Sequence, residues 1–522
     1  MTHSPEPNEP NEPNKAPAPR RSRWRSRRLW RSVGGGLGLA LLAGGAFGAW
    51  WAWAFVHQRL APLITENLSK TLNRPVEVGP LEQISLTGIR FGVSTLPPTS
   101  TDRDRATVQQ IKASYNLWQV LFNHRLGLDV TLVRPNAYLD QTADGKWIVT
   151  KLAETKDEGG LKIALDRLQM QDGTVVLDPS AAVMVDAKKP GATLTSDFAV
   201  TLRQMTGDVN FENDYKLTRF DLAGMPARGG ILRLRGEVNT DPSIKLKVLI
   251  QGDGLAVKDV NSLIATPVST DAGTLFSNLT VQVEDDAITA LDGTARLQNV
   301  TARVTEVPKT LTQGNVQLRF REQLITIEAG RTVYGSIPVA FKGTYDLVDG
   351  YNLTAQLRGV DIRQIQSTAA ITLPIPATGV FNADVAITGV PNQPVIRGTV
   401  SNRGPVRIDR VDLATVRTQF TLAGNVLNLE RLTATPSVGG AIAGTGRIVL
   451  GERGRITATA QVRNLPGDPI ARSYGVNSRD IRVGPLNADV RVAGGFNAVQ
   501  TAIRWQAPQG TYPAQGDIAI AG

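Results

Sequence analysis

Apolar and polar residues alternate along most of the chain from about residue 161 onward. In one such segment the apolar residues Phe381, Ala383 and Val385 are separated by polar or charged residues. Because successive side chains of a strand point to opposite faces, this pattern predicts β-strands with one apolar and one polar face. The apolar positions that we expect to line a shared groove are Ile244, Leu246, Val248, Ile250, Phe381, Ala383, Val385, Ile387, Leu486, Ala488, Val490 and Val492.

The alternating region repeats itself at a step of 105 residues. Asn-Ala-Asp-Val begins at Asn382 and again at Asn487, and 487 − 382 is 105. Gln356 begins Gln-Leu-Arg, and Gln461, again 105 residues later, begins Gln-Val-Arg. Self-similarity at a fixed period is typical of repeat proteins, in which each unit stacks on its neighbours. We therefore predict one elongated array in place of several separate globular domains.

A sheet with one apolar face must keep that face from water. After residue 123 the sequence contains no long amphipathic helix that could cover it. The sheet is therefore expected to curl toward itself and to leave a dry interior or a groove. The 50 glycines, the 30 prolines and the low aromatic content of 6% favour many short strands joined by turns. The predicted fold class is mostly β: an N-terminal transmembrane helix followed by an elongated repetitive groove of amphipathic antiparallel strands.

Arginines crowd the N-terminus immediately before an uncharged apolar segment. They are Arg20, Arg21, Arg23, Arg25, Arg27, Arg28 and Arg31. The uncharged residues 33–56 would form about 36 Å of helix, enough to cross a bilayer core of about 30 Å. Since arginines stay on the cytoplasmic side, we expect a single-pass anchor in the inner (plasma) membrane, with the N-terminus cytoplasmic and the bulk periplasmic. A cleavable signal peptide is the alternative, although its apolar region is usually only about 7–15 residues long.

This pattern divides the chain into four predicted parts. Residues 1–32 form a disordered Arg-rich tail, and residues 33–56 form the anchor helix. Residues 57–160 contain a short amphipathic helix and an N-terminal β region that caps the array. Residues 161–522 form the repetitive β groove. The sequence ends part-way through a repeat, so we expect it to be the N-terminal portion of something longer.

The sequence lacks the signatures of catalysis. The three histidines, His3, His57 and His124, have no partner at metal-ligand spacing, and there are no cysteines. No phosphate-binding loop or nucleophile elbow is present. We therefore expect no enzyme activity, no catalytic or metal site and no cofactor. An arginine cluster beside an apolar span favours a membrane partner over a nucleic acid, so no nucleic-acid partner is expected.

Several short motifs bear a family resemblance. They are Asn-Arg-Pro-Val-Glu-Val from Asn73, Val-Arg-Pro from Val133, Asp-Gly-Lys-Trp from Asp144, and the strand pair between Gly379 and Gly398. With the arginine cluster, the span and the amphipathic repeats, they make residues 30–522 resemble the N-terminal portion of the TamB family. TamB is the inner-membrane subunit of the translocation and assembly module and belongs to the AsmA-like bridge-like lipid-transfer proteins. Residues 97–104 and 117–122 are similar to cyanobacterial members.

The resemblance implies a long β-taco whose apolar groove carries phospholipid toward the outer membrane and supports outer-membrane protein assembly and protein secretion. It also implies a partner, an outer-membrane assembly barrel of the TamA type. In the family, that barrel is met by a C-terminal region that this sequence lacks. Two alternatives remain open from the residues alone. One is a structural periplasmic β-repeat tether, and the other is a scaffold for unfolded outer-membrane proteins without lipid transport.

Overall fold

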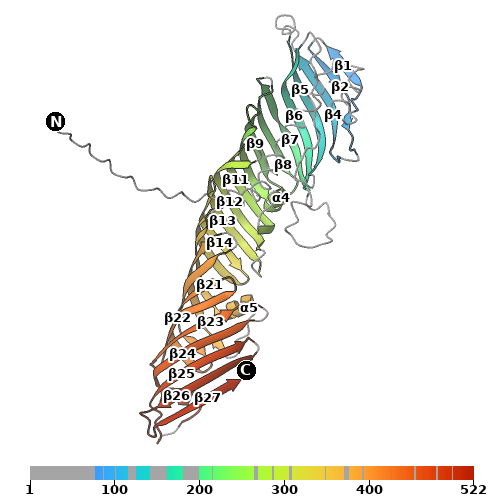
Figure 1. The fold of residues 1–522 in the computed structure, drawn as a ribbon. Coiled ribbons are helices and arrows are strands. Elements are labelled where there is room, and N and C mark those ends of the chain that lie inside the picture. Colours follow the sequence, from blue (N-terminus) through green and yellow to red (C-terminus); the bar gives the residue numbers. More distant parts are fainter. Residues whose placement is uncertain are drawn as a thin grey trace, which may run out of the picture.

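The chain forms an elongated, mostly β molecule (Figure 1). The structure is a computed structural model, and it describes residues 77–521 apart from interruptions, of which the longer are 116–124, 142–161 and 180–198. One 27-stranded sheet and three short helices make up the described part.

The elements follow one another along the sheet. The first strands are β1 (Leu81–Ser85), β2 (Gly88–Phe91), β3 (Ser94–Leu96), β4 (Arg105–Tyr115), β5 (Arg125–Asp140), β6 (Lys162–Asp178), β7 (Val200–Glu212), β8 (Leu217–Pro226), β9 (Ile231–Asn239) and β10 (Lys245–Ala256). Helix α4 (Val257–Leu263) precedes β11 (Val268–Glu284), β12 (Ala287–Val304), β13 (Leu311–Arg321), β14 (Leu324–Tyr334), β15 (Ile337–Asp346) and β16 (Gly350–Asp361). Helix α5 (Ile362–Ala369) precedes β17 (Ala377–Thr378), β18 (Val380–Gly389), β19 (Val395–Asn402), β20 (Val406–Ile408), β21 (Val411–Ala423), β22 (Val426–Pro436), β23 (Ala441–Val449) and β24 (Arg455–Pro466). Helix α6 (Gly467–Ser473) precedes β25 (Pro485–Gly495), β26 (Ala498–Ala507) and β27 (Ala514–Ala521).

Strands that are close in sequence are neighbours in the sheet. From β6 to β16 each strand pairs antiparallel with the next, and the ladder continues through β18, β19, β21 and β22 to β27. The short strands β17 and β20 pair with each other beside this ladder, and β20 also pairs with β21. The pair β5–β6 is parallel. Nearly all backbone pairing is therefore local in sequence, which suits a molecule that grows in one direction.

Strands β10, β16 and β24 form the same strand–helix unit three times. They begin at residues 245, 350 and 455, and the helices that follow begin at 257, 362 and 467, so each step is 105 residues. Each strand also carries a register shift near its end, at 252/255, 357/360 and 462/465. Such bulges bend a strand and increase its twist, which curls the sheet.

The three helices lie along one long margin of the sheet. Six antiparallel pairings separate β10 from β16, and six separate β16 from β24, so the three strands run in the same direction. Their ends therefore meet the same margin, as Figure 1 shows for α4 and α5. We call this margin, which also holds the turns β8–β9, β14–β15 and β22–β23, the helix-bearing lip. The opposite margin, with the turns β9–β10, β13–β14 and β18–β19, is the far lip.

Glycine is required where the helix-bearing lip closes tightly. Gly440, in the β22–β23 turn, has a φ of +84°, and a Cβ added there would lie 2.8 Å from Cα of Leu465. The left-handed backbone and the close approach both exclude a larger residue. This contact seats the turn directly on the bulge that precedes α6.

The membrane-anchor prediction needs correction. The segment 33–56 lies outside the described residues, and among the residues that are described no helix is long and apolar enough to cross a membrane. The predicted localisation, a single-pass protein of the inner membrane, is contradicted by this finding. The predicted arginine-rich tail and the motif that begins at Asp144 also lie outside the described residues, as does the predicted boundary between 160 and 161.

Asp468, in helix α6, offers a local test of how the helix-bearing lip is held together. Its carboxylate accepts hydrogen bonds from the backbone N–H of Val483 at 2.9 Å and of Gly484 at 3.4 Å. These bonds lower the pKa of Asp468 below its ordinary value of 3.8, and the bond from Val483 has the largest effect. A lowered pKa means that the stabilisation is present above about pH 3.8 and is lost as the pH falls through the lower folded value.

We expect Asp468→Asn to speed hydrogen–deuterium exchange at the Val483 and Gly484 amides, because a neutral amide is a weaker acceptor than a carboxylate. The matched control is Asp489→Asn on the outward face of β25, which should leave these amides unchanged. Equal exchange in the wild type and in Asp468→Asn would contradict the anchoring role.

Candidate functional site: an apolar trough

One face of the sheet carries a continuous apolar row from β10 to β27. Residues that pair directly across antiparallel strands share a face, so the row follows from the strand register. In sheet order it is Leu255, Leu275, Leu297, Val316, Gly330, Phe341, Ala355, Val385, Gly398, Phe420, Leu429, Gly446, Ala458, Val492, Thr501 and Ile520. Thr501 is the one polar residue in this row. We call this side of the sheet the inward face.

Two parallel rows widen the inward face toward the lips. One consists of Leu353, Ile387, Ile396, Leu422, Leu427, Ile448 and Ile456. The other consists of Ala383, Val400, Thr418, Leu432, Gly444, Ala460, Val490, Ile503 and Ile518. The inward face is therefore an apolar band several residues wide that continues from strand to strand.

The outward face carries charged pairs between neighbouring strands. Arg319 binds Glu328 at 2.7 Å, and Arg504 binds Asp517 at 3.0 Å. Arg358 forms an ion pair with Asp384 in the same way. These side chains are exposed, so each pair adds little stability. They identify the outward face as the one that faces water.

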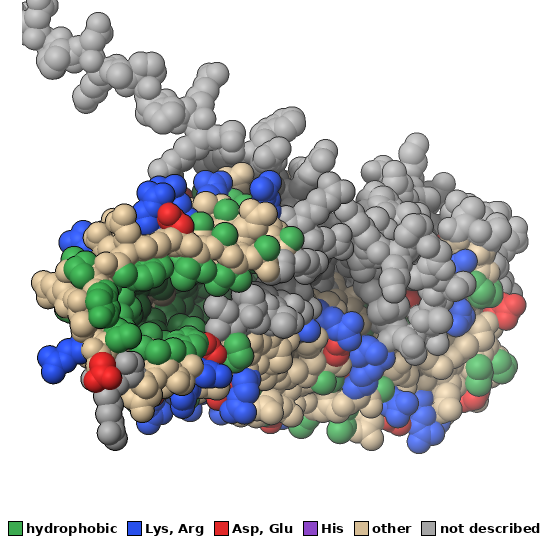
Figure 2. Space-filling model, turned by 90° about the horizontal axis from the view of Figure 1, so that it is seen from below, with side chains coloured by type: hydrophobic (Ala, Val, Ile, Leu, Met, Phe, Trp, Pro, Cys, Tyr) green, Lys and Arg blue, Asp and Glu red, His purple; other side chains and the backbone are tan. Residues whose placement is uncertain are grey.

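The inward face surrounds a hollow. Figure 2 shows hydrophobic side chains lining a cavity at one end of the molecule, with Lys, Arg, Asp and Glu on its outer surface. Along β24, which is typical of the C-terminal strands, every inward residue from Ile456 to Val462 is half-buried and every outward residue is exposed. The inward side chains are thus not covered as a closed core would cover them. We call this half-open part, from β12 to β27, the trough.

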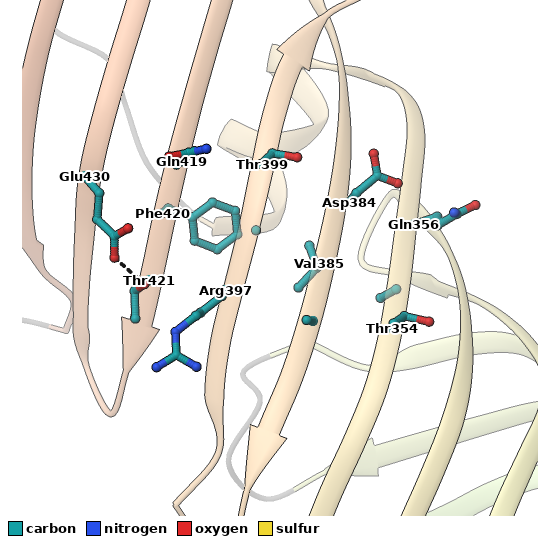
Figure 3. Close-up of a pocket in the computed structure, with 13 residues that line it drawn as sticks. Thr354, Gln356, Asp384, Val385, Arg397, Thr399, Gln419, Phe420, Thr421 and Glu430 are labelled. Carbon is teal, nitrogen blue, oxygen red and sulfur yellow. Dashed lines mark hydrogen bonds between the residues drawn. The ribbon is translucent and has the colours of Figure 1, made fainter.

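A depression of about 540 Å³ lies in the sheet over β16, β18, β19, β21 and β22. Its lining comes from both faces of the sheet and includes the outward polar residues Asp384, Arg397 and Thr399. Figure 3 also shows the inward residues Val385 and Phe420, which lie on either side of β19. Gly398 on β19 lies between these two side chains in the inward row, and a Cβ added to it would lie 2.7 Å from the Phe420 ring. The missing side chain lets the ring lie against the sheet. Phe341 does the same at Gly330, where an added Cβ would lie 2.5 Å from its ring.

The structure places the predicted groove residues on this face, but in two different environments. Leu246, Val248 and Ile250 on β10 are 3%, 1% and 8% exposed, so they belong to a dry core. Half-buried positions are Phe381, Ala383, Val385, Ile387, Leu486, Ala488, Val490 and Val492. Ile244 precedes β10 at the far lip and is 51% exposed, so it does not line the wall.

Sequence reasoning missed the glycine–aromatic pairs on the inward face. A glycine within an alternating strand signals a close approach, but the sequence analysis used Gly398 only as the end of a strand pair that resembles a family. Its partner Phe420 could not be identified from the sequence. The short strand β20 lies between β19 and β21 in the sequence, and neither strand by itself determines the register in which the two pair.

Titratable groups do not gather into a reactive centre in the described chain. No group of His, Cys, Asp or Glu among the described residues could hold a metal ion, and the three histidines lie outside them. Burial raises the pKa of the Tyr345 hydroxyl, and nearby Tyr351 and Asp346 raise it further. The rings of Tyr345 and Tyr351 lie 4.9 Å apart and belong to the inward face near the far lip.

Comparison with known proteins finds little. No protein-family model matches the chain, and no solved structure matches it significantly. The chain is similar to the rice (Oryza sativa subsp. japonica) protein SUBSTANDARD STARCH GRAIN 4, chloroplastic, at 23% identity over 277 residues. The match covers 45% of this chain and 13% of the rice protein. The chain therefore spans a small part of the rice protein, and this similarity does not assign the chain to a family.

Gly398 and Gly446 provide a matched pair of substitutions in the inward row. An added Cβ at Gly398 meets the Phe420 ring at 2.7 Å and the Asp384 carbonyl at 2.8 Å, whereas at Gly446 the nearest atoms are 3.4 Å away. We expect Gly398→Val to lower the free energy of unfolding by about 1–3 kcal/mol through overpacking. Gly446→Val should be neutral or slightly stabilising. Urea denaturation followed by circular dichroism measures both, and equal costs would contradict the assigned register.

Proposed function

We propose that the chain is an elongated lipid-carrying bridge whose trough holds acyl chains along β12 to β27. The supporting observation is the continuous inward row, whose side chains are half-buried on β23, β24 and β26. Soluble proteins rarely leave a contiguous apolar surface of this extent without a partner, because such patches are sites of association. The proposed ligand covers it.

Lipid chains suit the trough better than a compact ligand. An acyl chain gains about 0.8 kcal/mol for each CH₂ removed from water, wherever along an apolar surface it lies. The inward rows offer repeated Val, Ile, Leu, Ala and Gly positions and few polar groups, so no single position would trap the chain. Charged headgroups would remain in the water between the two lips.

The resemblance to the TamB family supports the same proposal in finer detail. On that basis the sheet is a repetitive β-taco of amphipathic antiparallel strands, and the ligand is membrane phospholipid on its way to the outer membrane. Support of outer-membrane protein assembly and secretion, and contact with a TamA-type barrel, belong to the proposal as well. The exposed outward charges and the described β-rich fold are compatible with it.

The test is lipid extraction and mass spectrometry of the purified chain and of the double variant Val385→Asp/Val490→Asp. We expect phospholipid with the wild type and little with the variant, because carboxylates on the floor would meet the acyl chains without a partner. The two sites are half-buried, so the carboxylates can reach water while the trough is empty and the fold should persist. Circular dichroism checks this.

The matched control is Thr388→Asp/Ala493→Asp, which adds the same charge to the outward face of the same two strands. It should keep the lipid. Absence of lipid from the wild type would overturn the proposal and favour a structural tether. Release of lipid by the control as well would show that the added charge acts without regard to the trough.

A further inference from the structure

Accessibility of the inward face changes sharply along the molecule. On the strands up to β10, inward residues such as Ile111, Val130 and Val248 are 0%, 1% and 1% exposed. They belong to one packed cluster that extends from β2 to β11. On β16 and β24, the equivalents of β10 in the next two units, the positions of Val248 are occupied by Leu353 and Ala458, which are half-buried. The apolar face is thus a dry core at one end and mostly half-buried at the other, where Val406, Leu413 and Ala434 form a separate small buried cluster.

Helix α4 lies where the two parts meet. Its first residue, Val257, is 6% exposed and packs in a cluster with Val300 and Ala302. Leu275 and Leu297, which begin the continuous inward row after β10, pack against the same cluster. The helix therefore places a side chain directly on the floor of the trough at its first strands.

The equivalent positions in the next units differ. The position of Val257 is occupied by Ile362 in α5 and by Gly467 in α6, at steps of 105 residues. Ile362 is half-buried, and Gly467 presents no side chain at all. Of these three helices, only α4 begins with a buried aliphatic residue and also lies next to the packed cluster of β2 to β11.

We propose that the trough ends blindly at β11 and α4, and that acyl chains enter it from the side, between the two lips, along β12 to β27. This inference rests on the proposed function. End-on passage through β2 to β10 would require the separation of side chains packed at native density, with the loss of their mutual contacts. Side entry requires no such rearrangement along most of the later strands, because inward side chains such as those of β23, β24 and β26 are only half-buried.

The experiment uses the full wild-type chain and vesicles that contain a phospholipid with a photoactivatable diazirine in its acyl chain. After illumination, mass spectrometry of peptides maps the lipid adducts. We expect adducts on inward residues of β12 to β27 and none on β2 to β10. Adducts on peptides that contain Val130 or Val248 would overturn the blind end while leaving the proposed function intact. Absence of adducts from the whole chain would overturn both.

A barrier variant distinguishes side entry from filling along the axis. Ala458→Glu/Ala460→Glu adds two carboxylates to the inward face of β24, at half-buried positions from which they can reach water. With side entry, adducts on β16 to β19 persist, because lipid reaches those strands without crossing β24. Their loss, with adducts on β25 and β26 retained, would show axial filling and overturn the proposal. Thr457→Glu/Thr459→Glu, on the outward face of the same strand, should change neither region.

Discussion

The structure depends on one constraint, which is the burial of the apolar face of an amphipathic sheet. The described chain offers no second layer that covers this face along its full length. Backbone pairing satisfies the polar groups of the strands inside the ladder, so the sheet extends through 27 strands. Side-chain burial cannot extend in the same way. It is most complete on β2 to β10, where the buried residues form two packed clusters, and it is less complete where inward residues line the trough. The first strands thus share a packed core, whereas much of the apolar face of the later strands stays partly exposed.

The sequence predicts the faces well and the environments poorly. Alternation alone places Leu246 and Val490 on one side of a sheet, and the matching tetrapeptides at Asn382 and Asn487 anticipate strands β18 and β25 at equivalent places in two units. Alternation cannot distinguish a residue that is 3% exposed, as Leu246 is, from one that is half-buried, as Val490 is. That difference comes from what lies across the hollow. It depends on how far the bulges bend each strand, and the bend is set by tertiary geometry.

The glycine–aromatic pairs show a second limit of sequence reasoning. Gly398 and Phe420 are in separate strands, and their juxtaposition follows from the register of two ladders. A one-residue slip would move Phe420 to the outward face. Membrane topology shows a third limit, because hydropathy in a segment of sequence predicted an anchor for which the described chain provides no spanning helix.

The local ladder also sets how such a molecule can change in length. One 105-residue unit, from β10 to β16, advances the sheet by six inter-strand steps, and at about 4.8 Å a step this is roughly 29 Å before twist is allowed for. Backbone pairing in the described ladder holds each strand mainly by the next, and side-chain contacts such as Tyr474 to Asp409 join neighbouring units. Duplication or loss of a unit would therefore change the reach of the molecule in increments of about 29 Å without the redesign of any existing strand. The length of the molecule can therefore evolve by duplication of whole units, without any change in the side chains of the apolar face.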